Sequence, residues 1–421
     1  MGKKILNNVF TAIDIGTTKI CVLIATNTPN GDIELIGIGQ HPSYGLKKGV
    51  VVNIAKTVDS ISQALKKAED MAGCKVEYAT VGISGGHIQS LNSTGIVAIK
   101  NKDISQEDVD RVIEAAKAVP ISKDQEILHV LPQYFKVDDQ ELILDSIGMS
   151  GVRLEAQVHI ITGAISSAQN IIKSCEMAGI KVSDIVLEQL ASADAVLTES
   201  EKELGVGILD IGGGTSDFAI YKDGRIMHSK VIPVAGNHFT NDLAIGLGVP
   251  IEKAEELKKK YGFVWEDNYL DLDKDSVEVD LGYQGKKKKV ETYSLYDILQ
   301  PRAEEVLDFL CEEMVNFKLK SFMPSGLVLT GGGSILTGMK ELAEKRFNLP
   351  VRIGIPTRYK SIDNKNICTV PDLLKNPIYA TGYGLLIYAG GHNNSEFSFS
   401  QEGSVFKKVF SRMKSWIYDF I

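Results

Sequence analysis

One pattern occurs twice in this chain and constrains its fold more than any other feature. An apolar strand ends in Asp-Ile-Gly, a turn of glycine and hydroxyl residues follows, and a second apolar strand comes next. One copy spans Gly207–Gly224 (GILDIGGGTSDFAIYKDG) and the other spans residues 10–26 (FTAIDIGTTKICVLIAT). The pattern predicts an internal repeat, with each copy folded as a β-hairpin whose tip consists of glycines and hydroxyls.

Both predicted tips suit a phosphate group. Glycine adopts positive φ and has no Cβ, so backbone N–H groups can approach phosphate oxygens closely. The aspartate that ends each first strand, Asp14 or Asp210, could orient a magnesium ion, which proteins usually hold by one or two carboxylates together with phosphates. Lys19 lies in the first turn, where its ammonium could reach a β- or γ-phosphate. Taken alone, either hairpin could instead use its glycines only to make a tight turn.

A third glycine turn follows another apolar strand, in the segment LVLTGGGSILTGM at residues 327–339. A helix that begins behind such a turn presents free N–H groups and the positive end of its dipole to an anion. Three turns of this kind at the ends of three strands favour an anion or nucleotide site over three unrelated turns.

The composition excludes several classes of protein. The formal net charge of −8 argues against nucleic acid as a principal partner. The five cysteines occur singly, without a CxxC motif, which is typical of a reducing cytosol. The seven histidines include no HExxH, so a metal site made only of protein ligands is not expected. The first residues also lack an apolar stretch long enough for a signal peptide.

Between the two hairpins the pattern changes. Residues 84–161 combine short alternating strands with a helix that begins after Ser105, which predicts a small α+β insertion. Its strands are expected at 88–91, 94–99, 126–131, 134–137 and 153–161. The main pattern then resumes with a helix at 163–178, a strand at 181–187 and a helix at 189–204. Glu188 lies at their junction and could position or activate a water molecule. The alternative is an ordinary acid that is stabilised by the helix dipole.

Three later segments complete the main part of the chain. Glu255 and Lys258 lie one helical turn apart and could hold a purine or ribose, or could form an ordinary surface pair. Residues 265–290 are polar and charged, which predicts an exposed hairpin or loop. A long helix is expected at 294–317, with a kink or break at Pro301.

The C-terminal segment has a different character. Residues 391–404 are small and polar, which predicts a flexible linker. Residues 405–421 have apolar side chains at helical spacing, with four basic residues and one acid, which predicts a membrane-surface helix that contacts anionic lipids. A helix docked on the core is the alternative. The residues assigned to the membrane are Phe406, Lys407, Lys408, Phe410, Arg412, Met413, Lys414, Trp416, Ile417 and Phe420.

The turns IDIGTTK, LDIGGGTSD and LTGGGS resemble those of the actin, sugar-kinase and heat-shock-chaperone ATPase superfamily. Within it, the segments VLEQLASADAVL and AEELKKKYG, the insertion and the amphipathic C-terminus resemble the FtsA family of bacterial division actin homologues. The resemblance covers nearly all residues from Thr11 to Tyr388, and the tail. It implies an α/β actin-like ATPase fold, in which two related domains flank a nucleotide cleft.

The resemblance also implies a division of the chain. The first domain would comprise residues 1–83 and 162–204, and the inserted subdomain, called 1C in this family, residues 84–161. The second domain would span 205–390, with its own subdomain at about 237–320. The linker at 391–404 and the membrane helix at 405–421 would follow.

Carried over residue by residue, the resemblance assigns a catalytic role to Glu188 and magnesium, through water, to Asp14 and Asp210. Arg302 matches a position associated with docking the C-terminal tail of FtsZ. ATP would be contacted by residues of the three turns and of one helix, namely Asp14, Gly16, Thr17, Thr18, Lys19, Asp210, Gly212, Gly213, Gly214, Thr215, Asp217, Glu255, Lys258, Gly331, Gly332, Gly333 and Ser334.

The function implied is that of an ATP-binding protein with at most slow ATPase activity. It would polymerise into actin-like filaments on the cytoplasmic face of the membrane at the division site, tether FtsZ there, and recruit later division proteins through the insertion. The alternatives are a membrane-associated actin-like ATPase of pilus assembly or of an MreB-type cell-shape system, or a small-molecule kinase. A kinase would need a catalytic aspartate facing a sugar pocket, which no segment marks.

Overall fold

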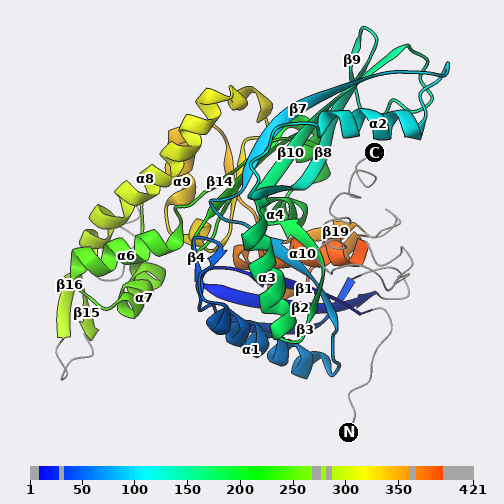
Figure 1. Ribbon diagram of the computed structural model, residues 1–421. Coiled ribbons are helices and arrows are strands. Elements are labelled where there is room, and N and C mark those ends of the chain that lie inside the picture. The colour runs from blue at the N-terminus through cyan, green and yellow to red at the C-terminus, as the bar shows by residue number, and fades with distance from the viewer. Residues whose placement is uncertain (1–8, 28–32, 268–275, 281–286, 361–366, 392–421) are drawn as a thin grey trace.

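The computed structural model describes residues 9–27, 33–267, 276–280, 287–360 and 367–391 (Figure 1). The amphipathic segment predicted at 405–421 lies outside the described residues, as does the predicted linker apart from Gly391. In the described part of the chain, no helix is both long and apolar enough to cross a membrane.

The first glycine-hydroxyl hairpin forms the centre of a five-stranded sheet. Across this sheet the strands are β11 (Lys181–Leu187), β6 (Tyr78–Ile83), β1 (Val9–Ile15), β2 (Lys19–Asn27) and β3 (Ile33–Pro42). β1 and β2 pair antiparallel, with Asp14 opposite Cys21, and β3 continues the antiparallel side. β6 and β11 are parallel strands on the other side. The first hairpin is therefore confirmed.

The second hairpin forms the centre of a second five-stranded sheet. Its strands, in order, are β14 (Arg225–Ile232), β13 (Ser216–Lys222), β12 (Val206–Ile211), β17 (Leu327–Thr330) and β18 (Val351–Ile353). Here too an antiparallel hairpin has a third antiparallel strand on one side and two parallel strands on the other. The two sheets follow one plan, so the internal repeat predicted from the hairpins is confirmed.

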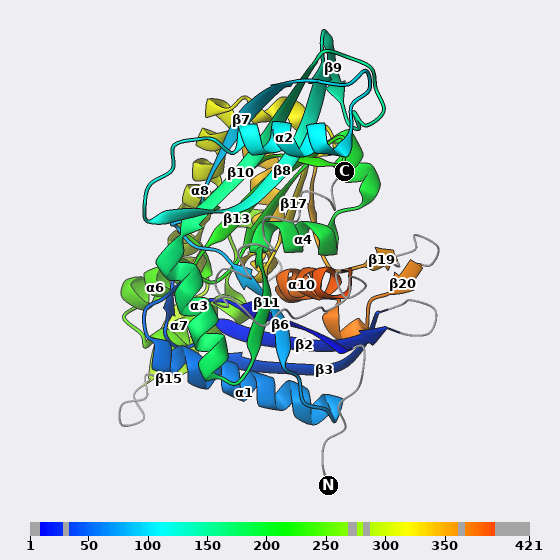
Figure 2. The same cartoon turned by 45° about the vertical axis from the view of Figure 1, so that its right-hand side comes forward.

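Helices cover both faces of the first sheet (Figure 2). On one face lie α1 (Ile54–Ala72) and α3 (Ile165–Met177), and on the other α4 (Glu188–Val196) and α10 (Ala380–Gly391). The Asn53 side chain caps the start of α1, and Gly73, which the helical spacing of residues 54–71 predicts as the C-cap, ends it with φ 69°. α10 comes from the end of the described chain, so its packing on β1 and α4 joins this late segment to the first sheet.

The second half carries its own helices, of which α8 is the longest. They are α6 (Gly236–Leu247), α7 (Ile251–Tyr261), α8 (Tyr293–Asn316) and α9 (Met339–Phe347). The break considered at Pro301 does not occur, because α8 continues through this residue. A proline removes only one N–H donor from a helix, and the helical turns on either side of Pro301 continue. The exposed hairpin predicted near 265–290 is confirmed by β15 (Ser276–Asp280) and β16 (Lys287–Glu291).

The single helix predicted at 189–204 is wrong. The chain forms α4 and then a separate α5 (Glu199–Leu204). The reason is that Thr198 begins a new helix, because its side chain accepts from the Glu201 N–H while the Glu201 carboxylate accepts from the Thr198 N–H.

The insertion is a four-stranded antiparallel sheet with one helix. Its elements are β7 (Gln89–Ala98), α2 (Gln106–Ala116), β8 (Gln125–Val137), β9 (Gln140–Ile143) and β10 (Arg153–Ala164), in the sheet order β7-β10-β8-β9. α2 begins after Ser105 as predicted. The strand pairs predicted at 88–91 and 94–99, and at 126–131 and 134–137, are each one continuous strand. Pro132 is tolerated inside β8 because it pairs at a register shift opposite Val158.

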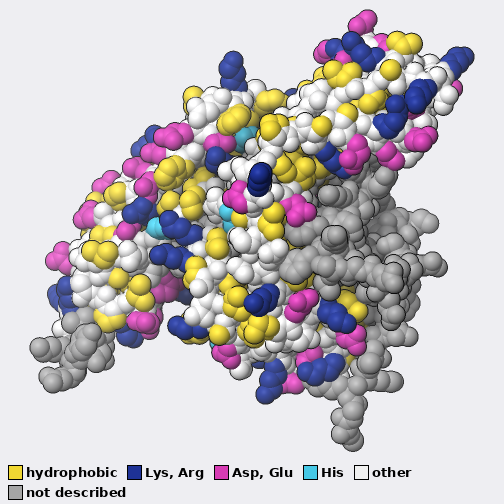
Figure 3. All heavy atoms as spheres, viewed as in Figure 1, with side chains coloured by type: hydrophobic (Ala, Val, Ile, Leu, Met, Phe, Trp, Pro, Cys, Tyr) yellow, Lys and Arg dark blue, Asp and Glu magenta, His cyan; other side chains and the backbone are white. Residues whose placement is uncertain are grey.

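Each of the three larger sheets has its own hydrophobic core. The insertion does not stand apart from the first core, because Ile88, Leu128, Leu131 and Ile161 are buried in it. Figure 3 shows that acidic and basic side chains are interspersed over the described surface on one face of the molecule.

The remaining elements are short. They are β4 (Leu46–Lys47), β5 (Val50–Val51), β19 (Arg358–Lys360), β20 (Ile367–Thr369) and the 3-10 turns η2 (Leu319–Phe322), η3 (Gly332–Ile335), η4 (Asp372–Leu374) and η5 (Pro377–Tyr379).

Candidate functional site

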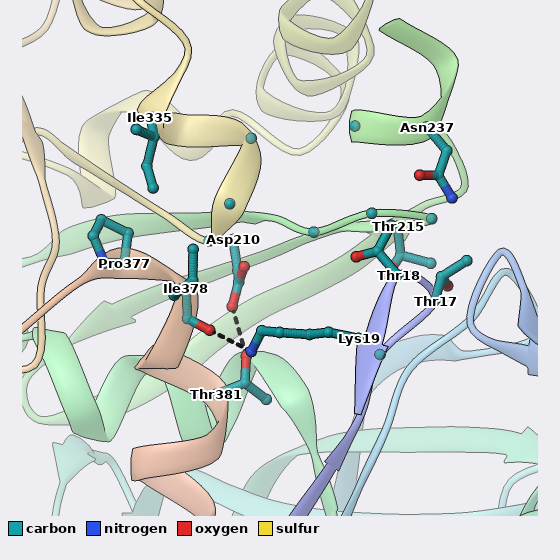
Figure 4. Close-up of a pocket in the computed structure, with 18 of the residues that line it drawn as sticks. Thr17, Thr18, Lys19, Asp210, Thr215, Asn237, Ile335, Pro377, Ile378 and Thr381 are labelled. Atoms are coloured by element: carbon teal, nitrogen blue, oxygen red, sulfur yellow. Dashed lines mark hydrogen bonds between the residues drawn. The ribbon is translucent and has the colours of Figure 1, made fainter. Parts of the chain in front are cut away.

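The tips of the two hairpins meet at a cavity of about 770 Å³ between the two halves of the chain (Figure 4). The third glycine turn, at the end of β17, lines the same cavity. The structure therefore brings together nearly all the residues that the sequence assigned to one site. Those that line the cavity are Asp14, Gly16, Thr17, Thr18, Lys19, Glu188, Asp210, Gly212, Gly213, Gly214, Thr215, Asp217, Glu255, Lys258, Gly331, Gly332 and Gly333.

Glycine is needed where the two tips approach each other. A Cβ added to Gly213 would lie 2.5 Å from Cγ2 of Thr18, and one added to Gly214 would lie 2.4 Å from Oγ1 of Thr17. Both distances are too short for real side chains, so only glycine allows this contact. The close approach puts the glycines and hydroxyls of both tips on the wall of one cavity, and backbone amides of such turns suit phosphate oxygens.

Five acidic side chains line the cavity, namely Asp14, Glu188, Asp210, Asp217 and Glu255. Three of them, Glu188, Asp210 and Asp217, have raised pKa values. Burial raises the pKa of Glu188 well above its ordinary value, and nearby Asp217, Asp14 and Asp210 add to the effect. Burial also raises the pKa of Asp217, although a hydrogen bond from the Ser84 hydroxyl opposes it. Acids held this close together repel one another when ionised, so the site favours a bound cation.

Asp210 is held in place by two hydroxyl groups. Its Oδ2 accepts hydrogen bonds from Ser192 of α4 and, at 2.9 Å, from Thr381 of α10. Burial raises the pKa of Asp210, while these two donors lower it. The carboxylate at the end of β12 is therefore fixed by helices from both the middle and the end of the chain.

The carboxylate chemistry fits magnesium. Among the described residues no group of three or more His, Cys, Asp or Glu side chains could hold a metal by itself. Asp14 and Asp210 both line the cavity and are carboxylates, the ligands from which magnesium takes one or two while keeping water and phosphate oxygens. A magnesium ion that depends on phosphate and water is consistent with this donor set.

The Lys19 side chain crosses the cavity and reaches Ile378, near the end of the described chain (Figure 4). Its ammonium donates to the carbonyl of Ile378 at 2.6 Å and lies 3.3 Å from Oδ2 of Asp14. Burial works against the charge of Lys19, but Asp14 outweighs it and the pKa is raised. The side chain therefore remains a cation inside the cavity.

Glu255 and Lys258 line the opposite part of the cavity, on α7. Their side chains form an ion pair at 2.6 Å, and the Lys258 ammonium also donates to the carbonyl of Gly236 at 3.0 Å and to Oγ1 of Thr240 at 2.8 Å. These bonds hold the pair against the start of α6, so the arrangement is more than an isolated surface pair on one helix.

Two predicted site residues lie elsewhere. The hydroxyl of Ser334 is buried and donates to the Gly331 carbonyl at 2.7 Å, so it braces the third glycine turn and does not line the cavity. Arg302 lies on α8 away from the cavity, with its Nε 2.6 Å from Oδ2 of Asp242 on α6. Their roles in nucleotide and partner binding stay predictions.

Sequence reasoning missed several residues of the site. Ser192 and Thr381 bind Asp210, while Asn237, Ile335 and Pro377 line the cavity. For Ser192 and Thr381, the sequence feature that could have indicated this role is the set of small residues around them. A Cβ at Gly384 would lie 1.8 Å from the Ala191 carbonyl oxygen, so α4 and α10 cross closely enough for both hydroxyls to reach one carboxylate.

Comparison with known proteins identifies the family. A family model described as cell division protein FtsA matches residues 207–384, and one described as an SHS2 domain inserted in FtsA matches residues 85–162. Cell division protein FtsA of Pseudomonas aeruginosa is 44% identical over 411 residues, which are 96% of each chain. The chain belongs to the FtsA family.

Solved structures confirm the actin-like ATPase fold predicted for this FtsA-family chain. The PilM–PilN type IV pilus biogenesis complex matches with a TM-score of 0.64 at 16% identity, covering 91% of this chain and 98% of the other. An MreB of Spiroplasma citri bound to ADP matches with a TM-score of 0.54 at 15% identity, covering 91% and 96%. At these identities the likeness concerns the fold alone.

Proposed function

We propose that this FtsA-family protein binds ATP and Mg²⁺ in the cavity between its two halves. The observation that carries the proposal is the meeting of three glycine turns and five acidic side chains around one cavity. Amides at such turns suit phosphate oxygens, and carboxylates suit a magnesium ion that also contacts phosphate. The bound ADP of the MreB neighbour supports a nucleotide in this fold.

Each part of the cavity would take one part of the ligand. Asp14 and Asp210 would hold the magnesium ion through water, and Lys19 with the hydroxyls of the two tips would bind the phosphates. Glu255 and Lys258 would lie beside the adenosine, with the third glycine turn beneath it. Bound Mg²⁺ would supply positive charge to the phosphate oxygens.

Glu188 would orient water at the phosphates. Its raised pKa makes it a stronger base than an ordinary glutamate, which suits the abstraction of a proton near neutral pH. We expect slow hydrolysis, with ATP acting chiefly as a conformational ligand, because a ligand that contacts both halves of the chain favours the closed arrangement. The domain division stated above, with the insertion at 84–161, is part of this proposal.

Calorimetric titration with ATP and Mg²⁺ tests the nucleotide site. Asp210→Ala should abolish detectable binding and leave the far-ultraviolet circular dichroism spectrum unchanged. The matched control is Asp308→Ala, which removes an aspartate paired with Arg346 on the surface, away from the cavity. Unchanged ATP affinity in Asp210→Ala would refute the assignment.

We further propose that the protein tethers FtsZ to the cytoplasmic membrane at the division site. Residues 405–421 would bind anionic lipids, and the C-terminal tail of FtsZ would dock near Arg302. The apolar side chain of Ile245 on α6 is 74% exposed and follows Asp242 by three residues, so it shares a helix face with the partner of Arg302. An exposed apolar residue beside a guanidinium group suits a peptide that has both apolar and acidic groups.

Self-association into filaments and recruitment of later division proteins through the insertion complete the proposal. Family membership supports it over the pilus-assembly, MreB-type and kinase alternatives, because the FtsA relative is similar along nearly its entire length.

A further inference from the structure

A buried histidine of the insertion contacts the residue that precedes Glu188. Nε2 of His129, on β8, accepts a hydrogen bond from the backbone N–H of Leu187 at 3.2 Å. His129 is completely buried, and Leu187 is the last residue of β11 and immediately precedes Glu188. The hydrogen bond therefore joins the insertion to the backbone that carries the proposed water-orienting acid.

This amide belongs to the last residue of a strand at the edge of the sheet. β11 is the edge strand of the first sheet, and its pairing with β6 ends at Leu187 opposite Ile83. Leu187 also occupies the N-cap position of α4 with φ −64° and ψ 129°, and its side chain makes no capping hydrogen bond. His129 thus supplies an acceptor at the point where the chain turns from strand to helix.

The Glu188 side chain has little room to compensate for a shift of this junction. A Cβ added to Gly82 on β6 would lie 3.1 Å from Cγ of Glu188, so the glutamate packs directly on the strand. A change in the position of Leu187 would therefore be passed to the carboxylate. Misplacement of a reacting group by about 1 Å can lower a rate about 100-fold.

The protonation state of His129 supports this contact. Burial lowers its pKa to about 3, so the imidazole is neutral under ordinary conditions and one of its nitrogens can accept a hydrogen bond.

The insertion also holds the other half of the cleft. Gln133, four residues along β8, donates to the carbonyls of Ile226 at 3.0 Å and Met227 at 2.9 Å, both on β14. Nε2 of His159 on β10 lies 2.8 Å from the Ser229 hydroxyl on the same strand. β11 and β14 are edge strands of the two five-stranded sheets. The insertion thus contacts both sheets, and the contact made by His129 is the one that adjoins Glu188.

We propose that His129 is a positioning residue for Glu188, through which the insertion controls the rate of nucleotide hydrolysis. The proposal rests on the nucleotide function proposed above. A partner that binds the insertion and shifts β8 would change turnover at the cavity without touching the nucleotide.

Three variants of the full chain test this proposal. His129→Leu removes the acceptor at similar volume, and His129→Gln restores an acceptor at about the reach of Nε2. His159→Leu is the matched control, since it removes a second fully buried histidine of the insertion that bonds to β14 instead of the Glu188 junction. Thermal unfolding by circular dichroism establishes that each variant is folded.

The first measurement is hydrogen–deuterium exchange of the Leu187 amide without nucleotide. We expect exchange to accelerate about tenfold or more in His129→Leu, and to remain slow in His129→Gln and His159→Leu. Unchanged protection in His129→Leu would overturn the proposal.

The second measurement is single-turnover hydrolysis of radiolabelled ATP. We expect the rate constant in His129→Leu to fall about tenfold or more at nearly unchanged ATP affinity, and Gln to restore it. A normal rate in His129→Leu, or an equal loss in His159→Leu, would show that the hydrogen bond serves only folding and would overturn the proposal. Failure of the unaltered chain to bind or hydrolyse ATP would instead refute the proposed function.

Discussion

Gly331, in the third glycine turn, gives the sharpest test of the site geometry. It has φ 80° and ψ 170°, a region that only glycine occupies readily. A Cβ at this position would lie 2.1 Å from Oδ1 of Asp210 and 2.6 Å from the carbonyl oxygen of Ile211. The aspartate cannot simply rotate away, because Ser192 and Thr381 hold its other oxygen.

The cost of Gly331→Ala can be worked from these contacts. The backbone strain amounts to about 1–3 kcal/mol, and forcing a methyl group into filled space adds about 1–3 kcal/mol. We therefore expect the free energy of unfolding to fall by about 4 kcal/mol. At about 2–4 °C per kcal/mol, the unfolding temperature should drop by about 10 °C.

Gly248→Ala is the matched control in the same half of the chain. Gly248 also has positive φ, at 60°, but the nearest atom to an added Cβ is the flexible Lys288 ammonium at 3.8 Å. The left-handed conformation alone should cost about 1–2 kcal/mol.

The assay is urea and thermal unfolding followed by circular dichroism, with ATP affinity measured on each variant. Gly331→Ala should weaken ATP binding because it displaces Asp210, and Gly248→Ala should not. Equal losses of stability in the two variants, or normal ATP binding by Gly331→Ala, would refute the reasoning.

Three further predictions concern the acids, the partner site and the membrane. The pKa of Glu188 is raised above its ordinary 4.5, so the folded protein holds this proton more tightly than the unfolded chain. The Glu188 carboxyl therefore lowers the stability of the folded protein as the pH rises above 4.5. Glu188→Gln should therefore raise the unfolding temperature of the nucleotide-free protein more at pH 8 than at pH 5. An equal gain at both pH values would contradict the upward direction of the pKa shift. Arg302→Glu should abolish binding of a peptide with the FtsZ tail sequence in fluorescence anisotropy, whereas Arg346→Glu, on the surface of α9, should bind normally; equal binding by both would exclude the Arg302 site. Trp416→Glu should release the protein from vesicles of anionic lipid in a flotation assay, because it puts a charge into the apolar stripe, and unchanged flotation would exclude an apolar membrane contact there.

The sequence predicted the centre of each sheet well because the two hairpins carry complete local signals. A strand, an aspartate, a glycine-hydroxyl tip and a second strand are all encoded within about 18 consecutive residues, and hairpin pairing depends on little else. The same locality explains why Gly73 was predicted to end α1, since it caps the helix directly.

The missed features depend on contacts between distant segments. Thr381 reaches Asp210 only because α10 returns from the end of the described chain to cross α4 at the small residues Ala191 and Gly384. The continuous strands β7 and β8 were divided at Asn92 and at Pro132, whose polarity and ring suggest a turn. In the fold, the Asn92 amide lies against Met227 of β14, and Pro132 falls at a register shift, so both are accommodated by neighbours far away in the sequence.

For the candidate site too, residues marked by local sequence were predicted and contacts between distant segments were not. Residues on the three glycine turns were found because the turns have recognisable composition, and Glu188 was found because it sits at a strand-to-helix junction. The support of that junction by His129 was not predictable, since nothing near position 129 indicates that β8 runs beside Leu187. Folding of the insertion against the first core creates that contact.

Co-sedimentation with liposomes of anionic lipid tests the central claim most directly. The full chain and a chain that ends at Ser404 would each be mixed with ATP, with and without purified FtsZ. The account predicts that only the full chain pellets and that it carries FtsZ with it. Pelleting without FtsZ would contradict the tether, and failure of the full chain to pellet would contradict the membrane helix.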